Sequence, residues 1–261
     1  MEKNLWALIL GCSSGFGEAT ALELAKGGYN IFGVHLDRRA TLPHVEEIIG
    51  KIQAAGRQAT FFNVNAADAE KRKEVIVRIH QEFEKNPGTV RVLLHSLAFG
   101  SLQPLAGAEN NATRQQMEMT ADVMGHSLVY WVQDVVKEGL MKSGGRIFAM
   151  TSSGGTRAMP SYGPVSAAKA ILESHIRQLA MELAPLEITA NAIRAGVTDT
   201  PALRKIPGHE RLIELARQRN PYGRLTTPQD VAAAVAVLAH PNLYWITGNV
   251  IGVDGGEDIV G

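Results

Sequence analysis

The chain has 261 residues, 45% of them hydrophobic and 20% charged, a length and composition that suit one α/β domain with a full core. Its 26 basic and 26 acidic residues balance, which argues against nucleic acid as the main partner because phosphate binding needs a basic surface. The single cysteine, Cys12, excludes an internal disulfide and suits a reducing cytoplasm, and no apolar run approaches the roughly 20 residues of a membrane span.

Short apolar runs alternate with helical patterns along the whole chain. Strands are expected at residues 5–10, 30–35, 59–64, 90–95, 146–151, 188–193 and 249–253. Helices are expected at residues 18–26, 45–55, 69–84, 114–142, 166–182, 209–218 and 228–239. Apolar strands that are not amphipathic, alternating with helices, indicate a parallel sheet covered on both faces. The predicted fold class is therefore α/β, a doubly wound sheet of about seven strands in one domain (1–261), with its ligand at the carboxyl ends of the strands.

A glycine-rich turn, Gly11-Cys12-Ser13-Ser14-Gly15-Phe16-Gly17, joins the first strand pattern to a helical one. Glycines lack the Cβ atoms that would keep a pyrophosphate off the backbone, and a helix N-terminus presents free N–H groups to it. The two serines add hydroxyl donors. The turn predicts a dinucleotide site; a tight turn without a ligand is the alternative.

The end of the second strand indicates which nicotinamide dinucleotide is preferred. An acid there would bind the adenosine ribose and repel a 2′-phosphate. The expected position holds His35, followed by Leu36, Asp37, Arg38 and Arg39. The missing acid and the two arginines favour NADPH, through charge-assisted hydrogen bonds. A small shift of register would place Asp37 on the ribose and favour NADH.

Tyr162 and Lys169 stand seven residues apart in a helical pattern. Seven steps of about 100° return to within ~20° of the starting direction, so both side chains can face one cleft. A neighbouring ammonium favours the ionised phenol and makes Tyr162 a better proton donor. The pair predicts an acid–base site, and two unrelated surface residues are the alternative.

These motifs together resemble the short-chain dehydrogenase/reductase family over nearly the whole chain. The turn spacing G-x-x-x-G-x-G is similar to that of the family, and residues 246–248 and 253–256 match its C-terminal strand. The resemblance implies a Rossmann-type fold. It also implies a cofactor site made of Gly11, Ser13, Ser14, Gly15, Phe16, Gly17, Arg38, Arg39, Asn63, Val64, Ser96, Leu97, Ala98, Lys169, Gly196, Thr198 and Thr200.

Within the family, the spacing of tyrosine and lysine resembles the enoyl-acyl-carrier-protein reductases. Most members carry the tyrosine four residues before the lysine, where this chain has Val165. Residues 95–99 (His-Ser-Leu-Ala-Phe) and 157–162 (Arg-Ala-Met-Pro-Ser-Tyr) are similar to segments of that branch, and residues 201–224 to its helical substrate flap. The helix asparagine of many ketoreductases is absent, with Met124 near its place.

The resemblance implies NADPH-dependent reduction of the trans-2 double bond of enoyl thioesters in fatty-acid synthesis. Hydride would enter at Cβ, Tyr162 would stabilise the enolate, and Lys169 would hold the nicotinamide ribose. The acyl group would contact Phe99, Met159, Tyr162 and Leu203. It further implies a cytoplasmic homotetramer without a metal ion, and an acyl carrier protein as the partner that presents the substrate.

Ser152 departs from the enoyl branch, many members of which have Tyr or Phe ten residues before the catalytic tyrosine. Ketoreductases of the family bind the substrate carbonyl with a serine near this place. Ser152 or Ser153 would then assist Tyr162, or simply cap the strand end. A ketoreductase is therefore the second hypothesis. A nucleotide-sensing protein without turnover is the third, and the intact Tyr162/Lys169 pair argues against it.

Overall fold

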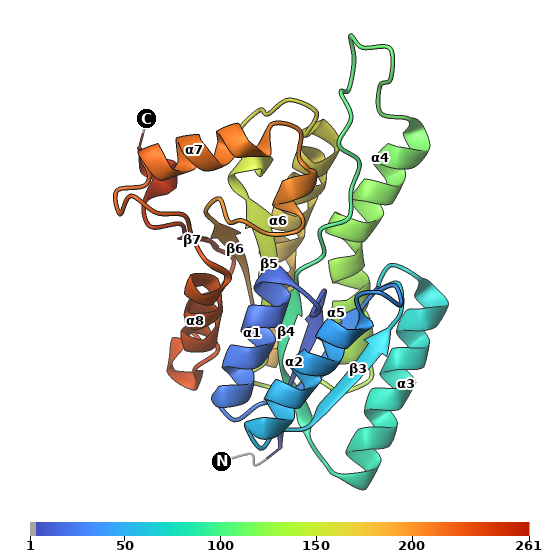
Figure 1. The fold of residues 1–261 in the computed structure, drawn as a ribbon. Helices are drawn as coiled ribbons and strands as arrows, with labels where there is room; N and C mark the ends of the chain where they lie inside the picture. Colours follow the sequence, from blue (N-terminus) through green and yellow to red (C-terminus); the bar gives the residue numbers. More distant parts are fainter. Residues whose placement is uncertain (1–3, 261) are drawn as a thin grey trace.

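The computed structural model describes residues 4–260, which contain one parallel sheet of seven strands in the order β3-β2-β1-β4-β5-β6-β7 (Figure 1). The strands are β1 (Leu5–Leu10), β2 (Asn30–His35), β3 (Ala59–Asn63), β4 (Thr89–His95), β5 (Arg146–Ser152), β6 (Thr189–Ala195) and β7 (Val250–Val253). The chain winds outward from β1 in one direction and from β4 in the other. The order reverses between β1 and β4, and doubly wound sheets bind their ligands outside the carboxyl ends of the strands at such a point. The α/β fold expected from the sequence is confirmed.

Helices cover both faces of the sheet (Figure 1). In the described residues these are α1 (Gly15–Lys26), α2 (Leu42–Ala54), α3 (Ala69–Lys85), α4 (Arg114–Ala121), α5 (Ser127–Lys137), α6 (Gly163–Leu183), α7 (His209–Arg219) and α8 (Pro228–Leu238). No helix of residues 4–260 is both long enough and apolar enough to cross a bilayer.

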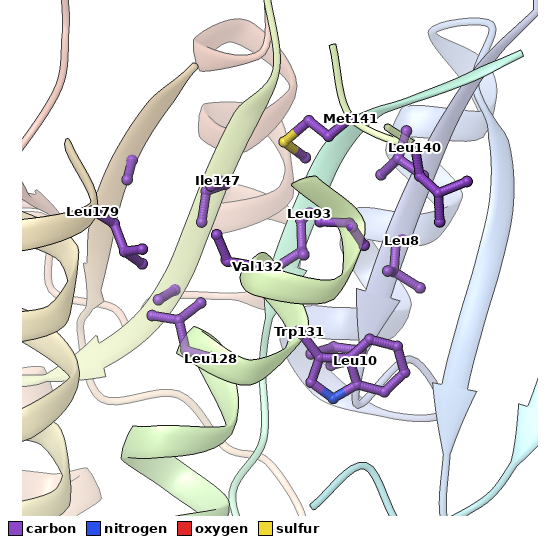
Figure 2. Close-up of a cluster of buried hydrophobic side chains, with 14 of the residues drawn as sticks. Leu8, Leu10, Leu93, Leu128, Trp131, Val132, Leu140, Met141, Ile147 and Leu179 are labelled. Atoms are coloured by element: carbon purple, nitrogen blue, oxygen red, sulfur yellow. The ribbon is translucent and has the colours of Figure 1, made fainter. Parts of the chain in front are cut away.

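The two faces of the sheet have separate hydrophobic cores because neighbouring strand residues point to opposite sides. In β1, Leu8 and Leu10 belong to the core beneath α3, α5 and α6, and Ala7 and Ile9 to the core beneath α1, α2 and α8. Figure 2 shows part of the first core, where Trp131 of α5 lies beside the side chains of the central strands. Because apolar side chains of the central strands point into both cores, these strands appear in the sequence as apolar runs.

The helix expected at residues 114–142 is interrupted. A π-helical turn, Asp122–His126, separates α4 from α5, and α5 ends at Lys137. A Cβ on Gly125 would lie 2.8 Å from Cγ2 of Ile171 in α6, so the turn brings two backbones close together. Ser127 Oγ also donates to the carbonyl of Val123 at 2.8 Å, which competes with the regular helical pattern.

Candidate active site

The glycine turn has no space for side chains at Gly11 and Gly17. A Cβ on Gly11 would lie 2.5 Å from the carbonyl oxygen of Ser96, and one on Gly17 would lie 2.0 Å from the carbonyl oxygen of Gly11. Gly11 also has a φ of +86°, in the left-handed region that glycine adopts readily. The turn is therefore packed against the end of β4, at the point where the strand order reverses.

The N-terminus of α1 is available to an anion. Ser14 is its N-cap residue, and its side chain makes no capping hydrogen bond. The first N–H groups of the helix and the Ser14 hydroxyl are thus free to bind a pyrophosphate, as the sequence predicts. A Cβ on Gly15 would lie 3.5 Å from Cγ2 of Thr200, so the loop after β6 adjoins the same turn. These features fit a dinucleotide.

The loop after β2 brings Asp37 to the glycine turn. Its carboxylate lies 3.0 Å from Nδ1 of the buried His35, and its backbone exchanges two hydrogen bonds with the Asn63 amide, at 2.9 and 3.0 Å. Burial raises the pKa of Asp37, but hydrogen bonds from Ser13, Thr41 and His35 outweigh it and hold the pKa below its ordinary value. A charged carboxylate therefore stands beside the turn.

The arginines that follow Asp37 lie further out. Arg38 and Arg39 are both exposed. Asn63 uses both ends of its amide to hold the Asp37 backbone, and Val64 donates its N–H to the carbonyl of His35 at 2.8 Å. The contact between Asp37 and Ser13 was not predicted from the sequence. The sequence indicated only that an acidic residue, Asp37, lies two residues beyond the expected ribose position.

Tyr162 and Lys169 are both buried, at 7% and 5% exposure, and both belong to the N-terminal part of α6. Tyr162 is the N-cap residue, and Lys169 lies inside the helix. The helix begins at Gly163, three residues before the start at residue 166 that the sequence predicted. Lys169 Nζ donates to the carbonyl of Met150 at 2.7 Å. Burial lowers the pKa of Lys169 to about 8, an effect that Glu173 partly offsets.

The Ser152 side chain is a neighbour of the Tyr162 phenol. Burial raises the pKa of Tyr162, and the interaction with Ser152 lowers it by less, so the pKa lies above its ordinary value. The lowering that the sequence predicted from Lys169 is therefore not seen in this structure. Ser152, at the end of β5, is thus the serine that reaches Tyr162. Ser153 instead accepts hydrogen bonds at its carbonyl from the N–H groups of residues 156 and 157.

An apolar cluster surrounds the tyrosine. It contains Tyr162, Val165, Ala168 and Met124, with Leu102, Val123, Met159 and Ile206 packed against them. Of the residues expected to contact an acyl group, the structure brings Met159 to Tyr162, whereas Phe99 is 63% exposed and Leu203 is half-buried. Leu102 and Ile206 were not predicted to be neighbours of Tyr162. In the sequence, Leu102 is only an apolar residue after the fourth strand, and Ile206 is only an apolar residue inside the expected flap.

His95 lies behind the lysine, fully buried at the end of β4. Its Nε2 atom is 2.8 Å from the hydroxyl of Ser127, and Nδ1 has no hydrogen-bond partner among the described residues. Burial, and secondarily the charge of Lys169, lower the pKa of His95 to about 3. His95 is therefore neutral at physiological pH and adds no positive charge near Lys169. No group of three His, Cys, Asp or Glu side chains within residues 4–260 could hold a metal ion.

The loop after β6 contains three residues expected at the nicotinamide. Thr198 and Thr200 are buried, and Thr198 Oγ1 donates to the carbonyl of Gly196 at 3.0 Å. The remaining expected cofactor residues follow β4, where Ser96 donates its N–H to the carbonyl of Leu10 at 2.9 Å and Ala98 is exposed. Together with the glycine turn, these loops form one continuous carboxyl edge.

Comparison with known proteins finds reductases that agree with the family expected from the sequence. The family model described as Enoyl-(Acyl carrier protein) reductase matches residues 11–257. A 1-cyclohexenylcarbonyl-CoA reductase of Streptomyces collinus is 31% identical, with 99% of this chain and 89% of that protein covered. An enoyl-[acyl-carrier-protein] reductase [NADPH] FabI of Staphylococcus aureus (strain MRSA252) is 31% identical, with 70% of this chain and 71% of that protein covered.

A solved structure agrees with the sequence relatives. An enoyl-[acyl-carrier-protein] reductase (NADH) from Aquifex aeolicus VF5 superposes with a TM-score of 0.85 at 25% identity, and covers 100% of this chain and 98% of its own. The relatives thus include proteins named for NADH and for NADPH. From the glycine turn to the C-terminal turn, the chain belongs to the enoyl-(acyl carrier protein) reductase branch of the short-chain dehydrogenases/reductases, and it is an oxidoreductase with a nicotinamide cofactor.

Proposed function

We propose that this chain reduces the trans-2 double bond of an enoyl thioester. The observation that carries the proposal is the position of Tyr162 relative to Val165. Val165 occupies the place of the usual family tyrosine, is 4% exposed, and packs in the apolar cluster. The proton-donating side chain is therefore displaced toward the start of α6. One helical turn is about 5.4 Å, which is the order of the offset between Cβ of an enoyl thioester and its oxygen.

A bound nicotinamide would supply the hydride, which enters the substrate at Cβ. Negative charge then develops on the thioester oxygen, and the resulting enolate takes up a proton that originates from solvent at Cα to give the saturated thioester. Tyr162 would donate a hydrogen bond to that oxygen, a stabilisation worth a few kcal/mol in a buried site. Lys169 would hold the nicotinamide ribose hydroxyls with its ammonium group. The buried, apolar surroundings of Tyr162 exclude water from the developing charge.

The acyl chain would lie against the apolar cluster. Met159 and Ile206 contact Tyr162 and its neighbours from two different segments, the loop before α6 and the segment before α7. We assign residues 201–224, which contain α7, as a flap over this surface. Phe99 and Leu203 would complete the acyl contacts when substrate binds.

For the cofactor, we propose NADH in place of the NADPH that the sequence favoured. Asp37 stands beside the glycine turn with a lowered pKa, so a 2′-phosphate there would meet a negative charge. The arginines that favoured NADPH in the sequence, Arg38 and Arg39, are exposed. We infer that Asp37 binds the adenosine ribose and that NADH is used in preference to NADPH.

We propose an acyl carrier protein as the group that presents the substrate to this cytoplasmic enzyme. The basic side chains of the flap outnumber its acidic ones, Glu210 and Glu214, even though Arg204 pairs with Asp199 and Arg224 with Asp230. They are Arg204, Lys205, Arg211, Arg217, Arg219 and Arg224. Such a surface favours an acidic partner, chiefly through a faster association rate. Coenzyme A is the alternative carrier, as in the name of the Streptomyces collinus relative. A homotetramer, which the family resemblance implies, is part of the same proposal.

The test follows the absorbance of NADH and NADPH with crotonyl and acetoacetyl thioesters in parallel, each on acyl carrier protein and on coenzyme A. The proposal expects turnover of the crotonyl thioester, faster with NADH. Turnover of the acetoacetyl substrate alone would refute it.

One observation favours a ketoreductase as the second candidate. The interaction between Ser152 and Tyr162 places two hydroxyl groups near one another, as is needed to bind a carbonyl oxygen. In that reaction hydride enters the carbonyl carbon, and Tyr162 gives its proton to the oxygen bonded to the same carbon. The acetoacetyl arm of the assay tests this candidate directly.

A further inference from the structure

The last turn of the chain, residues 254–258, lies between three loops of the carboxyl edge. It follows β7 and ends in a short 3-10 helix, Glu257–Ile259. In Figure 1 the C-terminus is drawn beside α7, on the side of the sheet that carries β6 and β7. The turn is internally fixed, because Asp254 accepts hydrogen bonds from the N–H groups of Gly256 and Asp258 at 3.0 and 3.2 Å.

Asp258 pairs with two arginines from different segments. Its Oδ1 atom lies 2.8 Å from the Arg157 guanidinium, and its Oδ2 atom lies 3.2 Å from that of Arg194 in β6. Arg157 also donates to the backbone carbonyl of Asp258 at 2.8 Å. The Asp258 side chain is 15% exposed, so the pairs are shielded better than an open surface ion pair. Asp258 therefore ties the chain end to β6 and to the segment ahead of α6.

The segment that Arg157 belongs to connects the two hydroxyl groups of the proposed site. It begins after Ser152 at the end of β5 and ends at Tyr162. Ser161, the residue before Tyr162, has a φ of +59°, a conformation that a non-glycine residue rarely adopts. A segment with such a backbone needs external support to hold one geometry. Arg157 provides an anchor at its middle.

Glu257 supports the opposite side of the site. Its Oε2 atom accepts the N–H of Val197 at 3.0 Å, and a Cβ on Gly196 would lie 3.0 Å from the same oxygen. Val197 directly precedes Thr198 and lies three residues before Thr200, which adjoins the glycine turn. Burial raises the pKa of Glu257, and the hydrogen bond from Val197 partly offsets this effect. Glu257 thus fixes the loop expected to receive the nicotinamide.

The turn also reaches the flap. Asn220, the C-cap residue of α7, donates from Nδ2 to the carbonyl of Asp254 at 2.8 Å. One turn of the chain therefore contacts the segment that carries the tyrosine, the loop after β6, and the end of the flap helix.

We propose that Glu257 and Asp258 are positioning residues that together set the distance between the Tyr162 phenol and the nicotinamide loop. Each acts through another group, Asp258 through Arg157 and Glu257 through the N–H of Val197. A misplacement of about 1 Å between reacting groups costs up to roughly 100-fold in rate. Residues that fix both the segment before Tyr162 and the loop after β6 therefore affect the rate directly; we call these contacts of Glu257 and Asp258 the clamp. The inference rests on the proposed role of Tyr162.

The test uses the full-length protein with Asp258→Asn and Glu257→Ala. Ile259→Ser is the matched control, because Ile259 lies in the same 3-10 helix as Glu257 and Asp258 and is 87% exposed. Turnover of the crotonyl thioester, cofactor binding by nucleotide fluorescence, and amide hydrogen exchange are measured for each. Asp258→Asn is expected to lower kcat about tenfold with cofactor Kd within about twofold, and to speed exchange within residues 153–162.

Glu257→Ala is expected to raise cofactor Kd about fivefold and to speed exchange within residues 196–200, because a half-buried N–H loses its acceptor. Glu257→Gln keeps an acceptor oxygen and is expected to restore most of the affinity. The control should match the wild type in every measurement. If Asp258→Asn does not fold, Arg157→Gln tests the same ion pair from its other side.

Two results would overturn the clamp. The first is wild-type kinetics and exchange in both carboxylate variants. The second is a uniform rise of exchange across the whole chain with no separation of kcat from cofactor affinity, since that would mean loss of general stability. If the wild type does not reduce the crotonyl thioester, the proposed function fails. Cofactor binding and local exchange still decide the clamp in that case.

Discussion

Ser152 and Tyr162 are neighbours in the site although they belong to different elements, the end of β5 and the start of α6, and the Ser152 side chain lowers the pKa of the phenol. Ser152 also accepts the N–H of Gly154 at 3.1 Å, which fixes its oxygen and leaves its proton for the phenol. The two hydroxyl groups thus form one unit at the carboxyl edge. The substrate decides whether both of them take part in the reaction.

Removal of the serine hydroxyl separates the two candidate reactions. In carbonyl reduction both hydroxyl groups would bind the oxygen that receives charge, whereas in enoyl reduction Tyr162 alone reaches the thioester oxygen. We expect Ser152→Ala to lower kcat for an acetoacetyl thioester at least about tenfold and for a crotonyl thioester less than about threefold. Ser153→Ala is the matched control and should change neither. Equal losses on both substrates would contradict the assignment of Tyr162 as the sole donor to the enolate.

The tyrosine and the lysine should affect different kinetic constants. Tyr162→Phe removes the donor to the developing negative charge and is expected to lower kcat about 100-fold or more, with cofactor affinity nearly unchanged. Lys169→Ala is expected to lower both kcat and cofactor affinity, because the ammonium would hold the ribose. Stopped-flow turnover and fluorescence titration measure the two effects. Equal and mild effects of both substitutions would show that the pair is not the catalytic centre.

Much of the fold could be predicted because it depends on local patterns. Both faces of the sheet are buried, so its strands appear in the sequence as apolar runs. The π-helical turn Asp122–His126 could not be predicted in this way. It depends on the contact between Gly125 and Ile171, which lie 46 residues apart in the sequence. A periodic pattern carries no information about such a contact.

In the site, too, local spacing could be predicted from the sequence, whereas contacts between distant residues could not. The glycine turn and the Tyr162/Lys169 pair are visible in the sequence because their spacing has a geometric meaning. The direction of the Asp37 carboxylate is not, because it depends on the amide of Asn63 and on His35. The proposed preference for NADH therefore depends on Asp37, whereas the sequence pattern favoured the two arginines that follow it.

Asp37 should control the choice of cofactor. Its carboxylate stands at the glycine turn, where it would accept a hydrogen bond from a ribose hydroxyl and repel a 2′-phosphate. Asp37→Ser is expected to change the ratio of kcat/KM for NADH to that for NADPH by about 100-fold in favour of NADPH. Arg39→Ser, a substitution of an exposed side chain, is the control and should shift the ratio less than about threefold. A wild-type preference for NADPH that survives Asp37→Ser would instead assign the choice to the arginines.

The buried lysine should give opposite pH trends for activity and stability. Burial lowers the pKa of Lys169 from 10.5 to about 8 in the folded protein. Between these values the unfolded chain binds more protons than the folded one, so this group makes the protein more stable as the pH rises. In the same range the folded protein loses the ammonium that would hold the cofactor ribose.

We therefore expect kcat/KM for the cofactor, which reports the free enzyme, to fall above a pH of about 8 while the melting temperature does not fall with it. Lys169→Arg keeps the positive charge at every accessible pH, because an arginine has a pKa above about 12. The variant should lose the alkaline decline even if its maximal rate is lower. If the variant shows the same decline, another group causes it. A decline that follows the melting temperature would mean that unfolding, rather than the charge of Lys169, limits activity at high pH.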